Sequence, residues 1–228
     1  MLRPLFRIWF SATQRGRDWL YPAGPSEVSI AGSDPIRVLV IGDGPAAGCG
    51  VLIHDRGFAA HLAGQVASVT KRGVVVTVAA QPTASARSTL RSLEEMVLDG
   101  YDCIILMLTT TDVLCLTSRE SWRRSMQRLV DAVNAADAAS VVVTSVASVH
   151  LTRPLKPFLR RLISSHAGAL NRETYRICLR TDTPVVVLSA ASELATDAYA
   201  RWGRDVGMHV AHAVPVSDSE NQPAQTGE

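Results

Sequence analysis

The chain has 228 residues, which is enough for one α/β domain with a substantial core and short for two. Hydrophobic residues make up 47% of the sequence and the formal net charge is +2, the balance of an ordinary globular protein. The arginines are scattered along the sequence, so it offers no case for a nucleic-acid-binding protein. No apolar run approaches the ~20 residues of a membrane span or forms a signal-peptide core, so we expect neither.

The cysteines indicate a reducing compartment. Cys49, Cys103, Cys115 and Cys178 form no Cys-x-x-Cys pair and show no regular spacing. We therefore expect reduced thiols and a cytoplasmic protein. The histidines lack metal-ligand spacing with cysteines or carboxylates, so we predict no metal site.

Residues 1–35 are predicted to form an N-terminal extension and a linker. Residues 1–10 are basic and apolar, and two interpretations stay open for them: a packed helix or unstructured leader, or weak contact with a membrane surface. In the second interpretation, the aromatic side chains of Phe6, Trp9 and Phe10 enter the lipid headgroup region. Arg3 and Arg7 would then contact anionic lipid. Residues 21–35 contain three prolines and two glycines, which predicts a linker.

Five short apolar runs predict buried strands at residues 37–41, 74–79, 103–108, 141–144 and 185–188. Apolar side chains at helical spacing predict helices over residues 54–70 and 85–98 and over about 193–214. A capping box of Thr117 and Glu120 predicts the start of another helix, whose buried stripe runs from Trp122 onward. A further helix is predicted to begin at Pro154 or Pro157.

This alternation of five strands and five helices predicts an α/β fold. The expected architecture is a three-layer α/β/α sandwich around a five-stranded parallel sheet of flavodoxin-like order. We expect the domain to cover residues 36–214 and residues 215–228 to form a disordered polar tail.

The turn after the first strand, residues 42–50, is the expected ligand site. It is rich in glycine and alanine, and open α/β sheets bind their ligands at the carboxyl ends of the strands. The sequence there begins Gly42-Asp43-Gly44. The third strand is followed by Thr109-Thr110-Thr111-Asp112. Near its start, the last helix contains Asp197 and Ala200.

In order and content these blocks resemble the SGNH (GDSL) hydrolases, a family of esterases and acylhydrolases, over about residues 37–214. In that family the first strand ends in Gly-Asp-Ser, the third in Gly-x-Asn-Asp, and Asp-x-x-His precedes the final helix. The resemblance therefore puts Gly44 at the nucleophile, Thr111 at the oxyanion-binding asparagine and Ala200 at the histidine. Asp197 is left without an imidazole to orient, and residues 74–99 contain no glycine for the second oxyanion amide.

Acyl transfer needs an attacking hydroxyl and a base, and neither Gly44 nor Ala200 supplies one. The resemblance thus implies a non-catalytic or strongly impaired ester hydrolase with no cofactor and a retained ligand cleft. A small neutral or weakly basic ester-like ligand would suit that cleft. Its expected floor is Gly42, Asp43, Gly44, Thr109, Thr111 and Asp112.

Three alternatives stay open. An active esterase with relocated residues would use Cys49 in the turn and His150 after the fourth strand, with Cys115 near the same edge. A nucleotide-binding protein would place phosphate on the turn Gly42-x-Gly44-x-x-x-Gly48, although this spacing is not Gly-x-Gly-x-x-Gly. A purely structural or interaction protein would need no ligand in the cleft.

Overall fold

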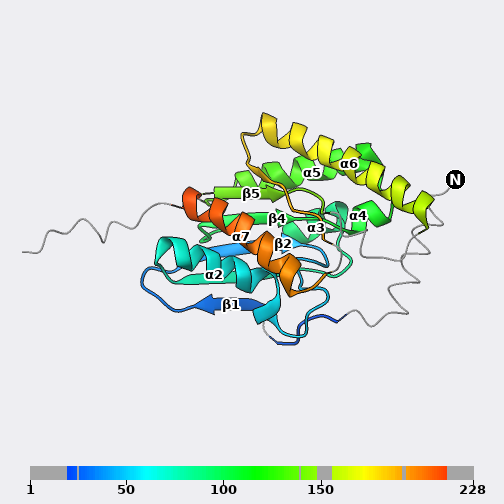
Figure 1. Cartoon of the computed structure of the whole chain (residues 1–228). Helices are drawn as coiled ribbons and strands as arrows, with labels where there is room; N and C mark the ends of the chain where they lie inside the picture. The colour runs from blue at the N-terminus through cyan, green and yellow to red at the C-terminus, as the bar shows by residue number, and fades with distance from the viewer. Residues whose placement is uncertain (1–19, 25, 139, 148–155, 192–193, 215–228) are drawn as a thin grey trace, which may run out of the picture.

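The computed structural model describes residues 20–24, 26–138, 140–147, 156–191 and 194–214, and Figure 1 shows a central sheet covered by helices. The N-terminal residues 1–19, which include the proposed membrane contact, and the predicted tail 215–228 lie outside this description. The strands are β1 (Glu27–Ile30), β2 (Ile36–Gly42), β3 (Val74–Ala80), β4 (Cys103–Met107), β5 (Ser140–Thr144) and β6 (Val185–Val186).

The strands form one sheet of order β1-β3-β2-β4-β5-β6. β1 is antiparallel to β3, and the other five strands are parallel to one another. The register places Val40 of β2 opposite Val78 of β3 and Ile105 of β4. The five parallel strands have the predicted flavodoxin-like order, and the direction of the strand order changes between β2 and β4.

Helices cover both faces of the sheet, which confirms the predicted three-layer sandwich. On one face lie α2 (Phe58–Thr70) and α7 (Thr196–Ala213), and on the other α3 (Ala86–Leu93), α5 (Arg119–Asn134) and α6 (Pro157–Arg180). The short helices η1 (His54–Arg56) and α4 (Thr111–Leu114) complete the described elements. Val40 enters the first core and Ile41 the second, so the apolar run of β2 is buried on both faces.

The α2–α7 contact is close because α7 has glycine where it meets α2. A Cβ added to Gly203 would lie 2.5 Å from the Cβ of His61, and one added to Gly207 would lie 2.7 Å from the Cβ of Gln65. Gly64, in contrast, has no atom within 4 Å of its added Cβ.

The strand β1 corrects the prediction of a linker over residues 21–35. Its four residues pair with β3 through the register Val28 opposite Val76. Val28 is the one fully buried residue of β1, as expected for an edge strand packed on a single face. A strand this short, among prolines and glycines, has too little apolar periodicity to be predicted.

Several helix and strand ends also differ from prediction. Ser118, rather than Thr117, caps α5, and its hydroxyl accepts a hydrogen bond of 3.2 Å from the amide of Ser121. The α3 helix ends at Leu93, β6 spans two residues, and α7 begins at Thr196. The α6 helix begins at Pro157, one of the two predicted starts.

Candidate functional site

The candidate site lies at the carboxyl edge of the sheet, where the chain leaves β2, β3 and β4. Gly42 ends β2, and a side chain there would collide with its surroundings. An added Cβ would overlap the carbonyl oxygen of Met107 and lie 2.5 Å from the Cβ of Ala46. Glycine at this position therefore lets the turn after β2 pack directly against the end of β4.

Asp43 joins the turn after β2 to the loop after β4. Its Oδ1 accepts hydrogen bonds from the amide of Thr109 at 3.1 Å and from the hydroxyl of the same residue at 2.9 Å. Its Oδ2 accepts from the amides of Thr110 and Thr111 at 2.6 and 2.9 Å. Because both oxygens are engaged, this carboxylate holds the loop in place.

Burial also shifts the pKa of Asp43 from its ordinary value. The residue is 1% exposed. Burial raises the pKa of its carboxyl from 3.8 to about 6, although the hydrogen bonds from the following loop oppose that rise. The group is therefore ionised near neutral pH and protonated in mild acid.

Asp112 makes a second connection at this edge. Its Oδ2 accepts a 2.7 Å hydrogen bond from the amide of Ala86, the first residue of α3. A carboxylate is favourable there because the first amides of a helix lack intrahelical partners and carry partial positive charge. Asp112 thus links the loop after β4 to the start of α3, and Asp43 links the same loop to the turn after β2.

The backbone of Gly44 faces three neighbours. A Cβ added to Gly44 would lie 3.3 Å from the hydroxyl of Tyr21, 3.3 Å from the carbonyl oxygen of Pro82 and 3.8 Å from the Cβ of Cys49. Contacts of 3.3 Å are tight but not prohibitive. The space next to Gly44 is therefore occupied, chiefly by a tyrosine from the segment before β1.

That segment packs along the turn after β2. The carbonyl of Leu20 accepts a 2.8 Å hydrogen bond from the amide of Gly50. Pro22 lies against Gly48, whose φ is +81° and whose added Cβ would lie 2.7 Å from the Cγ of the proline. Leu20, Tyr21 and Pro22 together form what we call the strap.

Tyr199 of α7 also contacts the turn after β2. Its buried hydroxyl donates a hydrogen bond to the carbonyl of Cys49, and its ring packs edge-on against Trp202 at 5.8 Å between centroids. Burial holds the pKa of this phenol well above its ordinary value, so it remains a donor. Sequence reasoning missed both Tyr21 and Tyr199.

The remaining motif positions differ in exposure. Asp197 is exposed in the first turn of α7, and Ala200 is half-buried one turn further on. The hydroxyl of Thr111 is buried and forms no hydrogen bond within the described part of the chain. His150 lies outside the described residues.

The expected cleft floor is not an open surface. Each of its six residues is buried, and Asp43 and Asp112 are both engaged in hydrogen bonds to the backbone. In the structure these residues connect the loops at this edge, and a ligand-facing role for them stays a prediction. The residues are Gly42, Asp43, Gly44, Thr109, Thr111 and Asp112.

The cysteines differ in their relation to the site. Cys49 is buried next to Gly44, whereas Cys115 is half-buried after α4. Burial raises the pKa of Cys103 to about 12 and that of Cys178 to about 11, so neither is a thiolate near neutral pH. Of the four thiols, Cys49 is the one whose Cβ lies next to Gly44, at 3.8 Å from an added Cβ.

The turn after β2 gives little support to phosphate binding. Amides at positions 47 to 51 donate to backbone carbonyls, among them Cys49 to Gly44 at 2.9 Å and Ala47 to Asp43 at 3.0 Å. A phosphate-binding turn needs free amides at a helix start, and α2 begins only at Phe58.

Within the described residues, no group of three or more histidine, cysteine or acidic side chains is placed to hold a metal ion. No helix in that part of the chain is long and apolar enough to cross a membrane.

The fold defined by this sheet and its helices is that of the SGNH-type hydrolases, and solved structures share it. A lipase/acylhydrolase from Enterococcus faecalis matches with a TM-score of 0.65 at 14% identity, over 80% of this chain and 99% of its own. A carbohydrate acetylesterase from Sinorhizobium meliloti matches with a TM-score of 0.60 at 11% identity, over 78% and 99%. A lipolytic G-D-S-L family member from Veillonella parvula matches with a TM-score of 0.58 at 15% identity, over 78% and 100%.

No family model and no curated protein matches the sequence. At identities this low, the structural likeness establishes the fold alone.

Proposed function

We propose that the protein is a non-catalytic or strongly impaired relative of the SGNH-type ester hydrolases. The observation that carries the proposal is the environment of Gly44, the position that corresponds to the nucleophile. It has no side chain to attack an ester, and the hydroxyl of Tyr21 lies only 3.3 Å from the position that a Cβ would take. Losing the nucleophile of a serine hydrolase lowers turnover on the order of 10⁶-fold.

The proposal includes a binding role for this edge of the sheet. A small neutral ester-like ligand would have to take the place of Tyr21 above Gly44, because the residues beneath are packed. The strap is held there by a backbone hydrogen bond at Leu20 and by the contact of Pro22 with Gly48. Phenyl acetate is a suitable probe, and we expect Tyr21→Ala to bind it more tightly than the wild type in a thermal-shift titration.

Turnover of short-chain aryl esters tests the loss of catalysis. We expect the wild type to hydrolyse them no faster than buffer. The informative variant is Gly44→Ser with Ala200→His, and its matched control is Gly44→Ala with Ala200→His, which adds the same Cβ without the hydroxyl. Activity in the serine variant alone would support the assigned positions. Wild-type turnover well above the blank would overturn the proposal.

An esterase that uses Cys49 is the second candidate, and one observation favours it. The Cβ of Cys49 lies 3.8 Å from the Cβ position of Gly44, which places a thiol beside the expected site of attack. This candidate predicts ester turnover that Cys49→Ala and His150→Ala each abolish and that Cys115→Ala retains. Alkylation by iodoacetamide should then block turnover in proportion to modification of Cys49.

A further inference from the structure

The helices α5 and α6 carry a strong positive charge that the linear sequence conceals. Together they contain nine arginines and three acidic residues, a formal charge of +6. The rest of the chain therefore carries −4, because the total is +2. All nine arginines are exposed: Arg119, Arg123, Arg124, Arg128, Arg160, Arg161, Arg172, Arg176 and Arg180.

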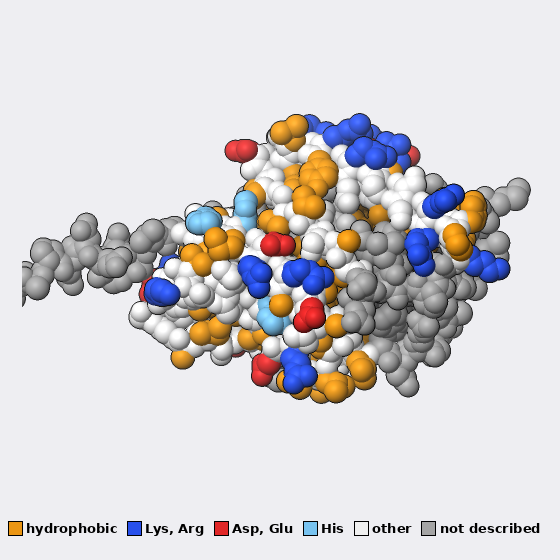
Figure 2. Space-filling model, viewed as in Figure 1, with side chains coloured by type: hydrophobic (Ala, Val, Ile, Leu, Met, Phe, Trp, Pro, Cys, Tyr) orange, Lys and Arg blue, Asp and Glu red, His pale blue; other side chains and the backbone are white. Residues whose placement is uncertain are grey.

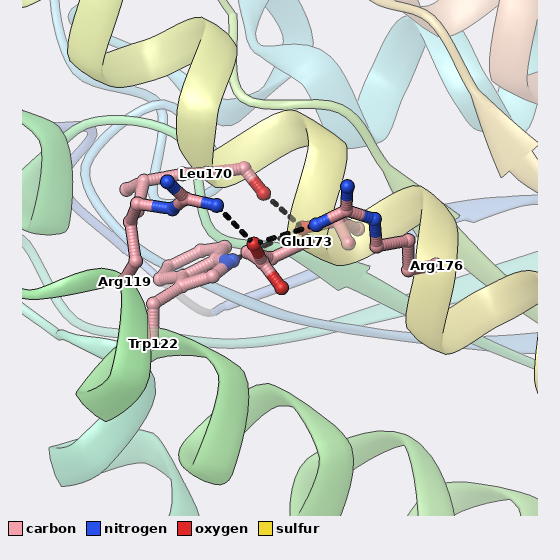
Figure 3. A network of polar contacts seen from close by, with 6 residues as sticks. Arg119, Trp122, Leu170, Glu173 and Arg176 are labelled. Atoms are coloured by element: carbon pink, nitrogen blue, oxygen red, sulfur yellow. Dashed lines mark hydrogen bonds and ion pairs between the residues drawn. The ribbon is translucent and has the colours of Figure 1, made fainter.

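The one acidic residue of α6 offsets only part of this charge, because two arginines share its single carboxylate. Glu173 is buried to 7% exposure, and its Oε1 is bound by Arg119 at 2.8 Å and Arg176 at 3.0 Å (Figure 3). The hydrogen bond from Arg119 holds the pKa of Glu173 below its ordinary value, so the carboxylate stays ionised and paired. Its charge serves the α5–α6 contact, and the outward face of α6 has no acidic side chain.

Exposed apolar side chains share this outward face with the arginines. Phe158 is 71% exposed and Leu179 is 85% exposed, at the two ends of α6. At 3.6 residues per turn, Phe158 and Leu179 fall within one arc of about 100° around the axis of α6, and this arc also contains Tyr175 and three arginines. The arginines are Arg161, Arg172 and Arg176. Figure 2 shows Lys and Arg side chains along the edge formed by α6, with hydrophobic side chains near both of its ends.

We propose that this face of α6 binds the surface of an anionic lipid bilayer. Guanidinium groups pair with lipid phosphates, and the apolar side chains enter the boundary between headgroups and acyl chains. A nucleic acid would satisfy the arginines, but it would leave an aliphatic side chain as exposed as Leu179 without a partner. The combination of positive charge with exposed aliphatic and aromatic groups therefore favours lipid.

The geometry fits a helix that lies parallel to the membrane. Phe158 and Leu179 are separated by 21 positions along α6, or roughly 30 Å at 1.5 Å per residue. The arginines lie between them and alongside them, so the whole length of the helix contacts one plane. Binding is peripheral and reversible, because two apolar anchors with basic residues give far less affinity than a spanning helix.

Co-sedimentation of the full-length protein with vesicles tests the proposal. We expect binding to phosphatidylglycerol-rich vesicles, weak binding to pure phosphatidylcholine, and loss of binding at high salt. Arg161→Ala with Arg172→Ala should weaken binding by about fivefold for each arginine removed. The matched control is Arg201→Ala with Arg204→Ala, two exposed arginines of α7 on the other layer, which should bind as the wild type does.

A second pair of variants separates a lipid surface from a general polyanion site. Phe158→Ser with Leu179→Ser removes no charge and should also weaken vesicle binding several-fold, while the far-ultraviolet circular dichroism stays unchanged. Retained vesicle binding by both α6 pairs, together with its loss on Arg3→Ala and Arg7→Ala, would overturn the proposal and place the contact in the N-terminal residues. Tighter binding to duplex DNA than to the anionic vesicles would overturn it as well.

Discussion

Replacing Asp43 by asparagine tests whether its carboxylate holds the site together. An asparagine offers one acceptor oxygen, and its NH2 group would face the amides of Thr110 and Thr111 or the donors of Thr109. Each buried donor left without an acceptor costs about 1–3 kcal/mol. Against this, the neutral side chain escapes the net cost of ionising the buried carboxyl, roughly 3 kcal/mol for a pKa raised from 3.8 to about 6. Near neutral pH the net loss of unfolding free energy should be small, roughly 0–3 kcal/mol.

The raised pKa of Asp43 also determines how the unfolding free energy changes with pH. Because the folded pKa of Asp43 lies above the unfolded value, the folded state binds the proton more tightly. The stability that this group contributes is fully present below about pH 4 and is lost as pH rises through about pH 6. Lowering the pH from about 7 to about 5 should therefore add about 1.3 kcal/mol to the wild type through Asp43. The asparagine variant gains nothing from this group.

Urea unfolding followed by tryptophan fluorescence measures the difference. The free-energy gap between the wild type and Asp43→Asn should widen by about 1 kcal/mol on going from about pH 7 to about pH 5, because other titrating groups cancel in the comparison. Asp99→Asn, at an exposed position, is the control and should leave the unfolding free energy unchanged at both values. A gap that stays constant or narrows on acidification would refute the assignment of a raised pKa to Asp43.

Two further changes test the packing around the site by urea unfolding. Tyr199→Phe should lower the unfolding free energy by about 1–3 kcal/mol, because the carbonyl of Cys49 loses its buried donor. The control is Tyr175→Phe, at an exposed position of α6, which should have no effect. Equal losses in the two variants would contradict the role of the hydrogen bond. Gly203→Ala should cost about 1–3 kcal/mol by pushing α7 from α2, whereas Gly64→Ala, in open space, should stabilise by up to about 1 kcal/mol. A neutral Gly203→Ala would show that the two helices separate without cost.

The parallel sheet was predictable because its strands are nearly continuous apolar runs. β2 has five consecutive buried residues, Val38 to Gly42, and such a run has few alternatives in a folded chain. The same argument explains where prediction failed. β1 buries only Val28 fully, and its place in the sheet comes from pairing with β3 rather than from its own sequence.

The site was predictable in position but not in its contacts. The strand order places the turn after β2 at the carboxyl edge, as expected from the alternation of strands and helices. The contacts of Tyr21 and Tyr199 depend on tertiary packing, and the latter joins residues 150 positions apart. An isolated tyrosine in a proline-rich segment or on a helix gives no signal of such a contact.

The charged face of α6 was overlooked for a different reason. Its arginines are spread over 21 positions of sequence, so a linear scan finds no cluster. Helical periodicity gathers Arg161, Arg172 and Arg176 on one side, and α5 adds four more arginines nearby. Plotting the predicted helices as wheels would have revealed this face without a structure.

The two aspartates have structural roles that are sufficient to explain their presence at this edge of the sheet. Asp43 accepts four hydrogen bonds from one loop, and Asp112 binds the first amide of α3, so both carboxylates stabilise the edge of the sheet whatever happens at Gly44. A hydroxyl at position 44 or an imidazole at position 200 would contribute to reaction but little to folding. Asp43 and Asp112 are therefore weak evidence for catalysis in this chain, because their hydrogen bonds already account for them.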